Sequence, residues 1–457
     1  MEIKDRCIII IGAARSGIAS ALFLAGQENR VYLTDVKDRR EFSEAALAPL
    51  EKAGVSFIFG RQPDIKKIRP DLIIISPGVP MDIPPVQEAR KQAIPVWSEI
   101  ELAASFTRSP IVAVTGTNGK TTTTALIGQI LKDAGKNTFV AGNIGVAFVS
   151  RAASLTCNDV AVLETSSFQL ENTYRFKPHV AVIVNITPDH LDRHGSLQGY
   201  IAAKTRIFTN QDENDWLILN WDDEETRKLA KSAQGKVIFF SRKEKLAEGF
   251  CLENGKLTAK IAEKNVSIIG PEDIFIKGGH NLENALAACA AGWVMGVDAD
   301  SLKKSLQTFP GVEHRLEYVL TYQGVRYIND SKGTNVDAAI KALEAFGEPI
   351  ILIAGGKGKG TSFLPFAEKI REKAKALVLI GQAAGEIGEA VRQAGFYQYV
   401  YARDLRDAIR KATELAAPGD IVLLSPACAS YDMFKHFEHR GEVFKELVRE
   451  LAETNSL

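Results

Sequence analysis

The sequence lacks the patterns of a disulfide-bonded, zinc-binding, membrane-spanning or nucleic-acid-binding protein. It has five cysteines, an odd number, and none of them forms a CxxC pair, which argues against both a disulfide framework and a zinc site. Its 56 lysines and arginines are balanced by 56 acidic residues, so the basic surplus typical of nucleic-acid-binding proteins is missing. No apolar run is long enough to span a bilayer. We therefore expect a cytoplasmic protein that binds neither nucleic acid nor a membrane.

Strand-like apolar runs alternate with helical patterns almost throughout the chain. This alternation is typical of parallel α/β layers. With 457 residues, of which 46% are hydrophobic, the chain is too long for a single core. The region 241–270 is charged and gives no clear signal. We predict an α/β protein of three domains, each a mostly parallel sheet with flanking helices, over residues 1–100, 101–311 and 312–457.

A glycine-containing turn in the middle block has the properties of a polyphosphate-binding loop. A β-branched strand over 111–115 breaks at Gly116, and a helix begins near Lys120. Such a turn can point several backbone N–H groups at one anion, and the helix N-terminus adds partial positive charge. Val114 stands where the usual phosphate-loop pattern has its first glycine, so a chance strand–turn–helix corner is the alternative. The predicted nucleotide-binding residues of this loop are Gly116, Thr117, Asn118, Gly119, Lys120, Thr121 and Thr122.

Two more strand-like runs of the middle block end near side chains that bind metal ions. Glu164 ends the run 160–164, and His190 follows the run 180–186. Ligands gather at the carboxyl ends of parallel strands, so both side chains would meet the phosphates if these strands are neighbours. Mg²⁺ prefers oxygen ligands, which suits Glu164 and the Thr121 hydroxyl, and His190 would serve a second divalent site. Taken alone, Glu164 fits a helix cap or a solvated acid, and His190 fits a surface histidine.

The first block begins with a turn that resembles a dinucleotide-binding fingerprint. Gly12 and Gly17 follow a strand, and Asp35 ends the next one, where it could accept hydrogen bonds from a sugar or base. Ala14 replaces the glycine that would let the backbone approach a pyrophosphate. NAD(P), another nucleotide, or no ligand at all, with a bare strand–helix turn, remain open from the residues alone.

The third block has three polar segments just past strand-like runs. They are residues 329–334, 355–359 and 425–430, rich in lysine, glycine and hydroxyl side chains. Lysines and hydroxyls at such positions suit a carboxylate ligand or developing phosphoryl charge. Each segment alone is a weak signal, but together they predict that the third domain closes over the nucleotide site.

These motifs together resemble the Mur ligase family, the ATP-dependent amide-bond enzymes of peptidoglycan precursor synthesis. The TGTNGKTT segment at 115–122 is shared across that family and with folylpolyglutamate synthases. Three segments, NDSKGTN at 329–335, GGKGKG at 355–360 and the run 425–444, look like the family member that adds D-glutamate. The DNPR motif of the diaminopimelate- or lysine-adding member is missing.

The resemblance implies a fold and an activity. It implies Rossmann-like N- and C-terminal domains around a central P-loop ATPase-type domain. The expected reaction adds D-glutamate to UDP-N-acetylmuramoyl-L-alanine through an acyl phosphate, with ATP and two Mg²⁺ sites, in a protein that acts as a monomer. No nucleophilic Ser or Cys is needed, because phosphoryl transfer of this kind depends on positioning and charge neutralisation.

The resemblance also implies roles for single residues. Lys120 would bind the β- and γ-phosphates, with Thr121 and Glu164 at the first Mg²⁺; His190 and a carbamylated Lys204 would hold the second. The nucleotide would further contact Asn284, Arg315 and Asp330, and the UDP-sugar would contact Asp35, Ser76 and Asn143. D-glutamate would be bound by Lys332, Thr334, Lys359, Ser430 and Phe437. Two departures stand out: Val36 replaces a hydroxyl residue frequent in the family, and Lys357 adds a second lysine to the glycine turn, where the spacing favours Lys359.

Three other functions compete with the ligase hypothesis. A folylpolyglutamate synthase would share the middle block but would have no reason to begin with the Gly12–Asp35 nucleotide block. An NAD-dependent dehydrogenase would explain the first block and leave the phosphate loop without a role. A non-catalytic nucleotide switch would have no use for a third substrate-binding domain.

Overall fold

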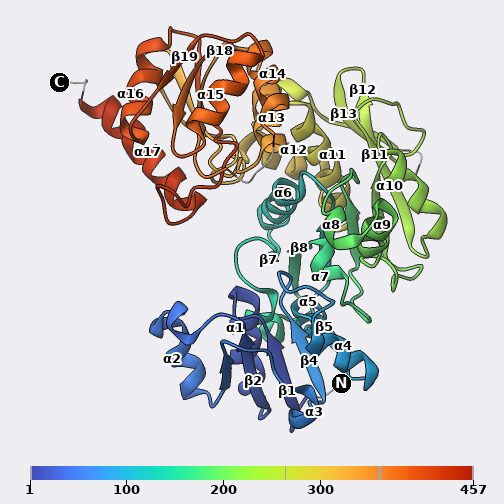
Figure 1. Ribbon diagram of the computed structural model, residues 1–457. Coiled ribbons are helices and arrows are strands. Elements are labelled where there is room, and N and C mark those ends of the chain that lie inside the picture. Colours follow the sequence, from blue (N-terminus) through green and yellow to red (C-terminus); the bar gives the residue numbers. More distant parts are fainter. Residues whose placement is uncertain (1–2, 263, 359–361, 455–457) are drawn as a thin grey trace. The chain divides into compact units, whose positions relative to one another are not determined.

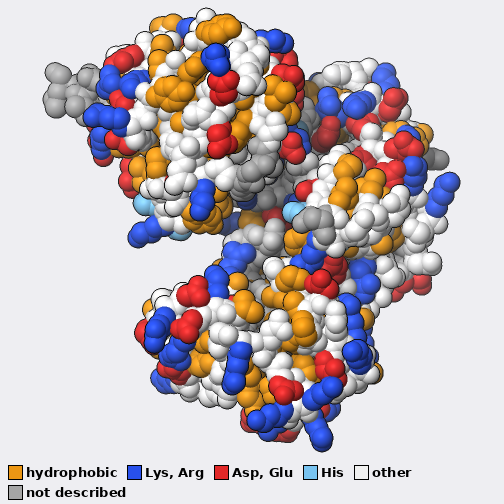
Figure 2. All heavy atoms as spheres, viewed as in Figure 1, with side chains coloured by type: hydrophobic (Ala, Val, Ile, Leu, Met, Phe, Trp, Pro, Cys, Tyr) orange, Lys and Arg blue, Asp and Glu red, His pale blue; other side chains and the backbone are white. Residues whose placement is uncertain are grey.

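The structure is a computed structural model that describes residues 3–262, 264–358 and 362–454 (Figure 1). These residues form two compact units. The first comprises residues 1–273 and 283–307, and the second comprises 274–282 and 308–457. On the face in view in Figure 2, basic and acidic side chains are interspersed, in keeping with the balanced charge of the sequence.

The first unit contains a parallel sheet of five strands near the N-terminus. Its strands are β1 (Cys7–Ile11), β2 (Arg30–Asp35), β3 (Ser56–Phe59), β4 (Leu72–Ile75) and β5 (Val96–Ser98). Its helices are α1 (Arg15–Ala25), α2 (Glu44–Lys52), α3 (Ile65–Ile68), α4 (Pro84–Lys91) and α5 (Glu99–Ala104). The strand order is β3-β2-β1-β4-β5. All five residues of central β1 are buried, as expected of a parallel strand covered on both faces.

The second sheet of this unit has nine strands. They are β6 (Ile111–Thr115), β7 (Asn137–Gly142), β8 (Asp159–Glu164), β9 (Val180–Ile183), β10 (Trp216–Asn220), β11 (Lys236–Ser241), β12 (Gly249–Glu253), β13 (Lys256–Ile261) and β14 (Lys264–Ile269). The helices are α6 (Lys120–Asp133), α7 (Ser167–Leu170), α8 (Leu191–His194), α9 (Leu197–Thr205), α10 (Glu224–Leu229), α11 (Gly279–Val294) and α12 (Ala299–Thr308). The order is β14-β13-β12-β11-β10-β9-β6-β8-β7. Central β6 therefore lies between β8 and β9, both parallel to it.

Two sequence expectations for this sheet need correction. The region 241–270 is not featureless, because it forms β12, β13 and β14, which pair antiparallel at the sheet edge. Asn254 and Gly255 both have positive φ, 51° and 73°, so the Asn-Gly pair makes the hairpin turn that its sequence favours. The predicted strand 180–186 ends at Ile183, because Asn185 leaves the ladder to bond with Asn118.

The second unit is a six-stranded sheet with helices on both faces. Its strands are β15 (Glu317–Tyr322), β16 (Val325–Asn329), β17 (Ile350–Gly355), β18 (Ala374–Ile380), β19 (Tyr399–Tyr401) and β20 (Ile421–Leu424). Its main helices are α13 (Val336–Glu344), α14 (Leu364–Lys373), α15 (Ala384–Gln393), α16 (Leu405–Leu415) and α17 (Phe437–Thr454). The order is β15-β16-β20-β17-β18-β19, with only β15 antiparallel to its neighbour.

Alternate residues of β17 point into two separate cores of this second unit. Ile350 and Leu352 pack with α13, α14 and α15, whereas Ile351 and Ile353 pack with α16 and α17. Figure 1 accordingly shows α16 and α17 on one side of the sheet and α13 and α14 on the other. The predicted α/β class with mostly parallel sheets is confirmed. The domain limits at 100/101 and 311/312 stay a prediction.

The five cysteines are all free, as the sequence predicted. Among the described residues, no helix combines the length and apolar character needed to cross a bilayer.

Candidate active site

The predicted phosphate loop joins β6 to α6, and its glycines have backbone conformations that other residues avoid. Gly119 has φ +82° and caps the N-terminus of α6. A Cβ atom on Gly119 would lie 2.2 Å from Oδ1 of Asn284, so no larger residue fits without movement. Asn284, on α11, also accepts a hydrogen bond from the Thr123 hydroxyl at 3.2 Å. The predicted nucleotide residue Asn284 therefore lies directly against the loop.

The outer side of the loop is held by the segment that follows β9. The Asn118 N–H donates to Asn185 Oδ1 at 2.9 Å, and Asn185 Nδ2 donates back to the Asn118 carbonyl at 3.1 Å. The Thr117 hydroxyl bonds the Thr187 carbonyl at 3.0 Å and lies 3.1 Å from the Tyr200 hydroxyl. These contacts fix the loop backbone before any ligand binds, and such preorganisation lowers the cost of binding.

Two lysine side chains meet at one carbonyl oxygen of the loop. Lys120 Nζ donates to the carbonyls of Gly116 at 3.0 Å and Thr117 at 2.8 Å. Lys204 Nζ, from α9, donates to the same Gly116 carbonyl at 2.7 Å. Thr121 and Thr122, in the first turn of α6, are buried. Lys120 thus adds positive charge at the start of a helix, where anions bind favourably.

Lys204 is almost completely buried, with 1% of the residue exposed. Its Nζ lies 4.5 Å from the centre of the Tyr200 ring. Burial first, and then the charge of Lys120, hold the pKa of Lys204 well below the usual lysine range. These surroundings favour the neutral form of the amine, which is the form that acts as a nucleophile.

Glu164 ends β8, the strand next to β6, and its carboxylate is half satisfied. The residue is 2% exposed, and Oε1 accepts a hydrogen bond of 2.7 Å from Asn143 Nδ2. Oε2 is buried and has no hydrogen-bond partner among the described residues. An unpaired buried carboxylate oxygen is costly unless a cation or water occupies its free side. Glu164 therefore fits a hard cation such as Mg²⁺, and the Thr121 hydroxyl, in the first turn of the helix after neighbouring β6, is of the same oxygen-donor type.

His190 lies seven residues after the end of β9, on the other flank of β6. Its backbone is left-handed, with φ 52°, and its ring packs against Phe168 with centroids 4.8 Å apart. Nε2 lies 3.5 Å from Oδ2 of Asp189, and half of the side chain is exposed. In the part of the chain that the structure describes, no three His, Cys, Asp or Glu side chains gather as a metal site. Mg²⁺ commonly completes its shell with water and substrate phosphates.

The glycine turn of the first sheet is tightly packed by its own residues. A Cβ on Gly17 would lie 1.9 Å from the Gly12 carbonyl oxygen. Residue 17 must therefore be glycine for the helix to pack this closely against the end of the strand. Ser76 donates to the same carbonyl at 2.8 Å. Asp35 accepts from the backbone N–H groups of Ala13 and Lys37 at 2.8 and 3.0 Å. The predicted sugar contacts Asp35 and Ser76 thus lie together at the carboxyl ends of β2 and β4.

Sequence reasoning missed Arg15, which links this turn to the second sheet. Its guanidinium donates to the carbonyls of Gly145 and, at 3.4 Å, of Gly142. Glu99, at the start of α5, accepts a 2.6 Å hydrogen bond from the Val149 N–H. Both contacts hold the segment containing Asn143, which in turn bonds Glu164. An arginine inside a glycine turn was the available signal for this role.

In the second unit, the three polar segments lie at the carboxyl ends of neighbouring strands β16, β20 and β17. Lys357 and Ala429 exchange two backbone hydrogen bonds, of 2.9 and 3.1 Å. Asp330 accepts from the Ser425 hydroxyl at 2.7 Å, and burial raises the pKa of Asp330 to about 6. The predicted ligand residues at these strand ends are Asp330, Lys332, Thr334 and Ser430, while Lys359 lies outside the described residues.

Two further predicted residues of this unit lie near His314. Phe437 begins α17, and its ring meets the His314 ring edge to face with centroids 6.2 Å apart. Arg315 is flanked by His314 and Leu316, both with positive φ, 62° and 44°. Backbone of this kind is strained and commonly found at functional sites.

Arg440 is a second residue that the sequence did not single out. It is fully buried, and it donates to the hydroxyl and carbonyl of Ser331, each at 2.9 Å, and to the Cys428 carbonyl at 3.2 Å. Burial lowers the pKa of Arg440 to about 10. The side chain ties α17 to the loops after β16 and β20, so it positions the predicted amino-acid site.

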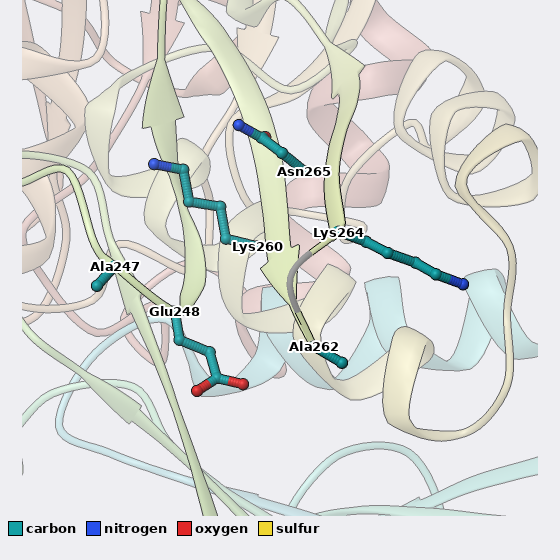
Figure 3. Close-up of a pocket in the computed structure, with 6 residues that line it drawn as sticks. All are labelled: Ala247, Glu248, Lys260, Ala262, Lys264 and Asn265. Atoms are coloured by element: carbon teal, nitrogen blue, oxygen red, sulfur yellow. The ribbon is translucent and has the colours of Figure 1, made fainter.

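A cavity of about 560 Å³ lies apart from all these residues, on the β12–β14 hairpins (Figure 3). Figure 3 shows Lys264 extending away from Lys260 and Asn265. Lys260 is paired with Glu253 at 2.8 Å, so this cavity offers no concentrated charge of one sign.

Comparison with known proteins agrees with this arrangement along the whole chain. Residues 6–98 match the Mur ligase MurD-like N-terminal domain, 114–292 the Mur ligase middle domain, and 314–428 the Mur ligase glutamate ligase domain. The UDP-N-acetylmuramoylalanine--D-glutamate ligase of Pelotomaculum thermopropionicum is 52% identical over 97% of both chains. The ligase of the same name from Alkaliphilus metalliredigens is 45% identical over 99% of both.

Solved structures show the same fold at lower identity. The UDP-N-acetylmuramate-alanine ligase of Thermotoga maritima superposes with a TM-score of 0.60 at 23% identity, covering 97% of this chain and 99% of that one. A MurF ligase from Thermotoga maritima, solved in complex with ADP, gives 0.58 at 18% identity, covering 93% and 96%. By fold, motifs and full-length similarity, the chain belongs to the Mur ligase family.

Proposed function

We propose that this protein is the ATP-dependent ligase that joins D-glutamate to UDP-N-acetylmuramoyl-L-alanine in peptidoglycan precursor synthesis. The observation that carries the proposal is the 52% identity, over 97% of both chains, to a relative named for that reaction. The structure supports the proposal separately from this similarity, because a hydrogen-bonded phosphate loop follows the strand next to the one that ends at Glu164. One oxygen of that buried carboxylate has no hydrogen-bond partner among the described residues.

The proposed reaction has two steps. First, the terminal carboxylate of the L-alanine residue attacks the γ-phosphorus of ATP, and the bond to the bridging oxygen of ADP breaks. This gives an acyl phosphate and ADP. The amine of D-glutamate, in its neutral form, then attacks the acyl carbon. Phosphate leaves from the tetrahedral intermediate, the nitrogen loses a proton, and an amide remains.

In this scheme the loop residues bind and orient the nucleotide. The backbone N–H groups from Gly116 to Thr122 and the ammonium of Lys120 would surround the β- and γ-phosphates. To do so, Lys120 would exchange its bonds to the loop carbonyls for phosphate oxygens, which are stronger, charge-assisted acceptors. Asn284 lies against the loop and would contact the nucleotide. In the second unit, Arg315 and Asp330 are proposed as nucleotide-contacting residues.

Mg²⁺ would neutralise charge on the transferred phosphoryl group when bound. Thr121 and Glu164 fit the first site, because Glu164 Oε2 is buried and unpartnered. For the second site we propose His190 and Lys204. The buried amine of Lys204, in its neutral form, can add to carbon dioxide and lose a proton, which gives a carbamate, a carboxylate-like oxygen donor.

The remaining predicted residues would bind the other two substrates. Asp35, Ser76 and Asn143 are proposed for the UDP-sugar. D-glutamate would be held by Lys332, Thr334, Lys359, Ser430 and Phe437. We further propose that the protein acts as a monomer. We place it in the cytoplasm because five free cysteines fit a reducing compartment.

Mass spectrometry of the reaction products tests the proposal. With Mg-ATP, UDP-N-acetylmuramoyl-L-alanine and D-glutamate, we expect a product heavier by one glutamate less one water. Replacing D-glutamate with hydroxylamine should trap the acyl phosphate as a hydroxamate, with release of phosphate. Formation of ADP without either product would contradict the proposed reaction.

A further inference from the structure

A second group of basic side chains lies at the amino ends of the strands of the nine-stranded sheet, opposite the end at which the phosphate loop lies. It lines a cavity of about 390 Å³ whose basic members are Arg108, Arg175, Lys177 and His179. We call this cavity the basic pocket. The described residues that line it include no acidic side chain. Its position follows from the strands: Arg108 and His179 come just before β6 and β9, whereas the phosphate loop follows β6.

The two sites are separated by the length of a strand. β6 has five residues, which corresponds to roughly 17 Å at about 3.3 Å per residue. A ligand in the basic pocket therefore would not contact the phosphate loop. The basic pocket is a separate place on the molecule, and the proposed ligase reaction gives it no role.

Two of the four basic side chains have no ion-pair partner among the described residues. Lys177 is paired with Asp212 and, at 3.3 Å, with Asp215, and His179 lies 3.1 Å from Asp215. Arg108 and Arg175 have no such neighbour in the part of the chain that the structure describes. Guanidinium groups match the geometry of phosphate oxygens and bind them through paired hydrogen bonds.

The backbone under both arginines is firmly held. The buried carboxylate of Glu101 accepts hydrogen bonds from three consecutive N–H groups, those of residues 174–176, at 2.8 to 3.0 Å. On the other wall, the Ser109 hydroxyl donates to the Asp159 carbonyl at 3.0 Å and accepts from the Ala161 N–H at 3.1 Å. Rigid walls reduce the ordering cost of binding a ligand between them.

An apolar cavity of about 410 Å³ adjoins the basic pocket and shares Arg175 with it. Most of its lining is apolar: Ile94, Pro95, Val96, Trp97, of which 8% is exposed, and Tyr174, together with the charged residues Arg90, Glu101 and Arg175. We call it the apolar pocket. More than half of the Tyr174 residue is exposed; the Arg206 guanidinium lies over its ring, 5.6 Å from the centre, so a ligand would stack on the other face. Phosphate recognition on one side of Arg175 and an apolar, aromatic surface on the other suit one ligand with both features.

We propose that the basic and apolar pockets together form a second binding site for a small phosphate monoester with an aromatic body. The phosphate is bound by Arg108 and Arg175, and the ring lies against Trp97 and Tyr174. Because the site lies where α5 leads from the first sheet into the second, a bound ligand would bridge the segments before β6 and β9.

Binding of phenyl phosphate tests the proposal, with inorganic phosphate as the matched probe and ionic strength held constant. We expect saturable binding at millimolar phenyl phosphate, at least fivefold tighter than inorganic phosphate. Arg108→Gln and Arg175→Gln should each weaken phenyl phosphate at least fivefold. Arg61→Gln, at an exposed arginine outside both pockets, should bind like the unaltered protein.

One variant distinguishes this site from the phosphate loop, and a second shows where the aromatic ring of the ligand binds. Lys120→Ala should leave phenyl phosphate binding unchanged, and Trp97→Phe should remove the fluorescence change that accompanies it. Unaltered thermal unfolding of the arginine variants would exclude misfolding as the cause. The proposal is overturned if binding is lost in Lys120→Ala but kept in Arg108→Gln and Arg175→Gln. It is also overturned if phenyl phosphate binds no tighter than inorganic phosphate or does not saturate.

Discussion

The buried amine of Lys204 lies 2.7 Å from the Gly116 carbonyl oxygen, to which Lys120 also donates at 3.0 Å. Two ammonium ions at one acceptor repel each other, and Lys204 is the buried member of the pair. Burial, and then the charge of Lys120, lower the pKa of Lys204 and so favour the neutral form of its amine. The phosphate loop therefore brings together Lys120, whose ammonium suits phosphate, and Lys204, whose lowered pKa suits carbamate formation.

Lys204→Ala should abolish ligase activity, and millimolar formate or acetate should restore part of it. A small carboxylate can occupy the space of the lost side chain and supply the oxygen donors of the proposed carbamate. Turnover is measured as ADP release with and without the added acid. High activity of the variant without added carboxylate would contradict the carbamate assignment.

Lys120→Ala should lower kcat at least ~100-fold, the scale expected for loss of one preorganised charged contact to the reacting group. Lys132→Ala is the matched control, because Lys132 lies exposed at the far end of the same helix. The control should turn over normally. Near-normal turnover by Lys120→Ala would remove the phosphate role from this residue.

Gly119→Ala and Gly135→Ala separate backbone strain from a steric clash. Both glycines have positive φ, +82° and +77°, but only a Cβ at residue 119 would strike Asn284. Each variant should lose about 1 kcal/mol of unfolding free energy from the left-handed backbone. Gly119→Ala should also weaken ATP binding at least tenfold, whereas Gly135→Ala should not. Equal ATP affinity in the two variants would contradict the proposed loop geometry.

Glu99 makes the stability of the first unit depend on pH. Burial raises the pKa of Glu99 from 4.5 to about 7. Between these two values the folded protein binds a proton that the unfolded chain has released, so stability falls as pH rises. The loss is complete above about pH 7 and amounts to about 3 kcal/mol at most, at 1.36 kcal/mol per pKa unit.

Glu99→Gln should therefore gain stability relative to the unaltered protein between pH 4 and pH 8. Urea unfolding followed by tryptophan fluorescence measures this, because all four tryptophans belong to the first unit. Glu213→Gln, at an exposed glutamate, serves as the control and should show no such trend. A stability difference between Glu99→Gln and the unaltered protein that is constant over this range would show that Glu99 does not titrate on folding.

The sequence predicts strand ends well because a parallel strand buried on both faces is a continuous apolar run. Glu164 ends such a run and Gly116 follows one, and the structure places β8 and β6 side by side. The three polar segments of the second unit likewise follow β16, β17 and β20, which are neighbours in the sheet. The order of strands in a sheet depends on long-range packing. The sequence analysis therefore had to assume that these strands are neighbours and could not predict it.

The residues that the sequence missed act through partners far away in the chain. Arg15 bonds carbonyls about 130 residues away, and Arg440 bonds Ser331, 109 residues away. Neither forms a local pattern, since an arginine near a glycine or in a helix is ordinarily a solvated side chain. The β12–β14 hairpins were missed for a different reason. Their lysines interrupt the alternation of apolar and polar residues that indicates a strand. The Asn254-Gly255 pair nevertheless gave a usable turn signal.

The most direct test is ADP release with Mg-ATP and UDP-N-acetylmuramoyl-L-alanine, comparing D-glutamate, L-glutamate and no amino acid. We predict sustained turnover with D-glutamate and only background release in the other two reactions. Turnover with none of the three, from a protein that still binds ATP, would contradict the ligase function.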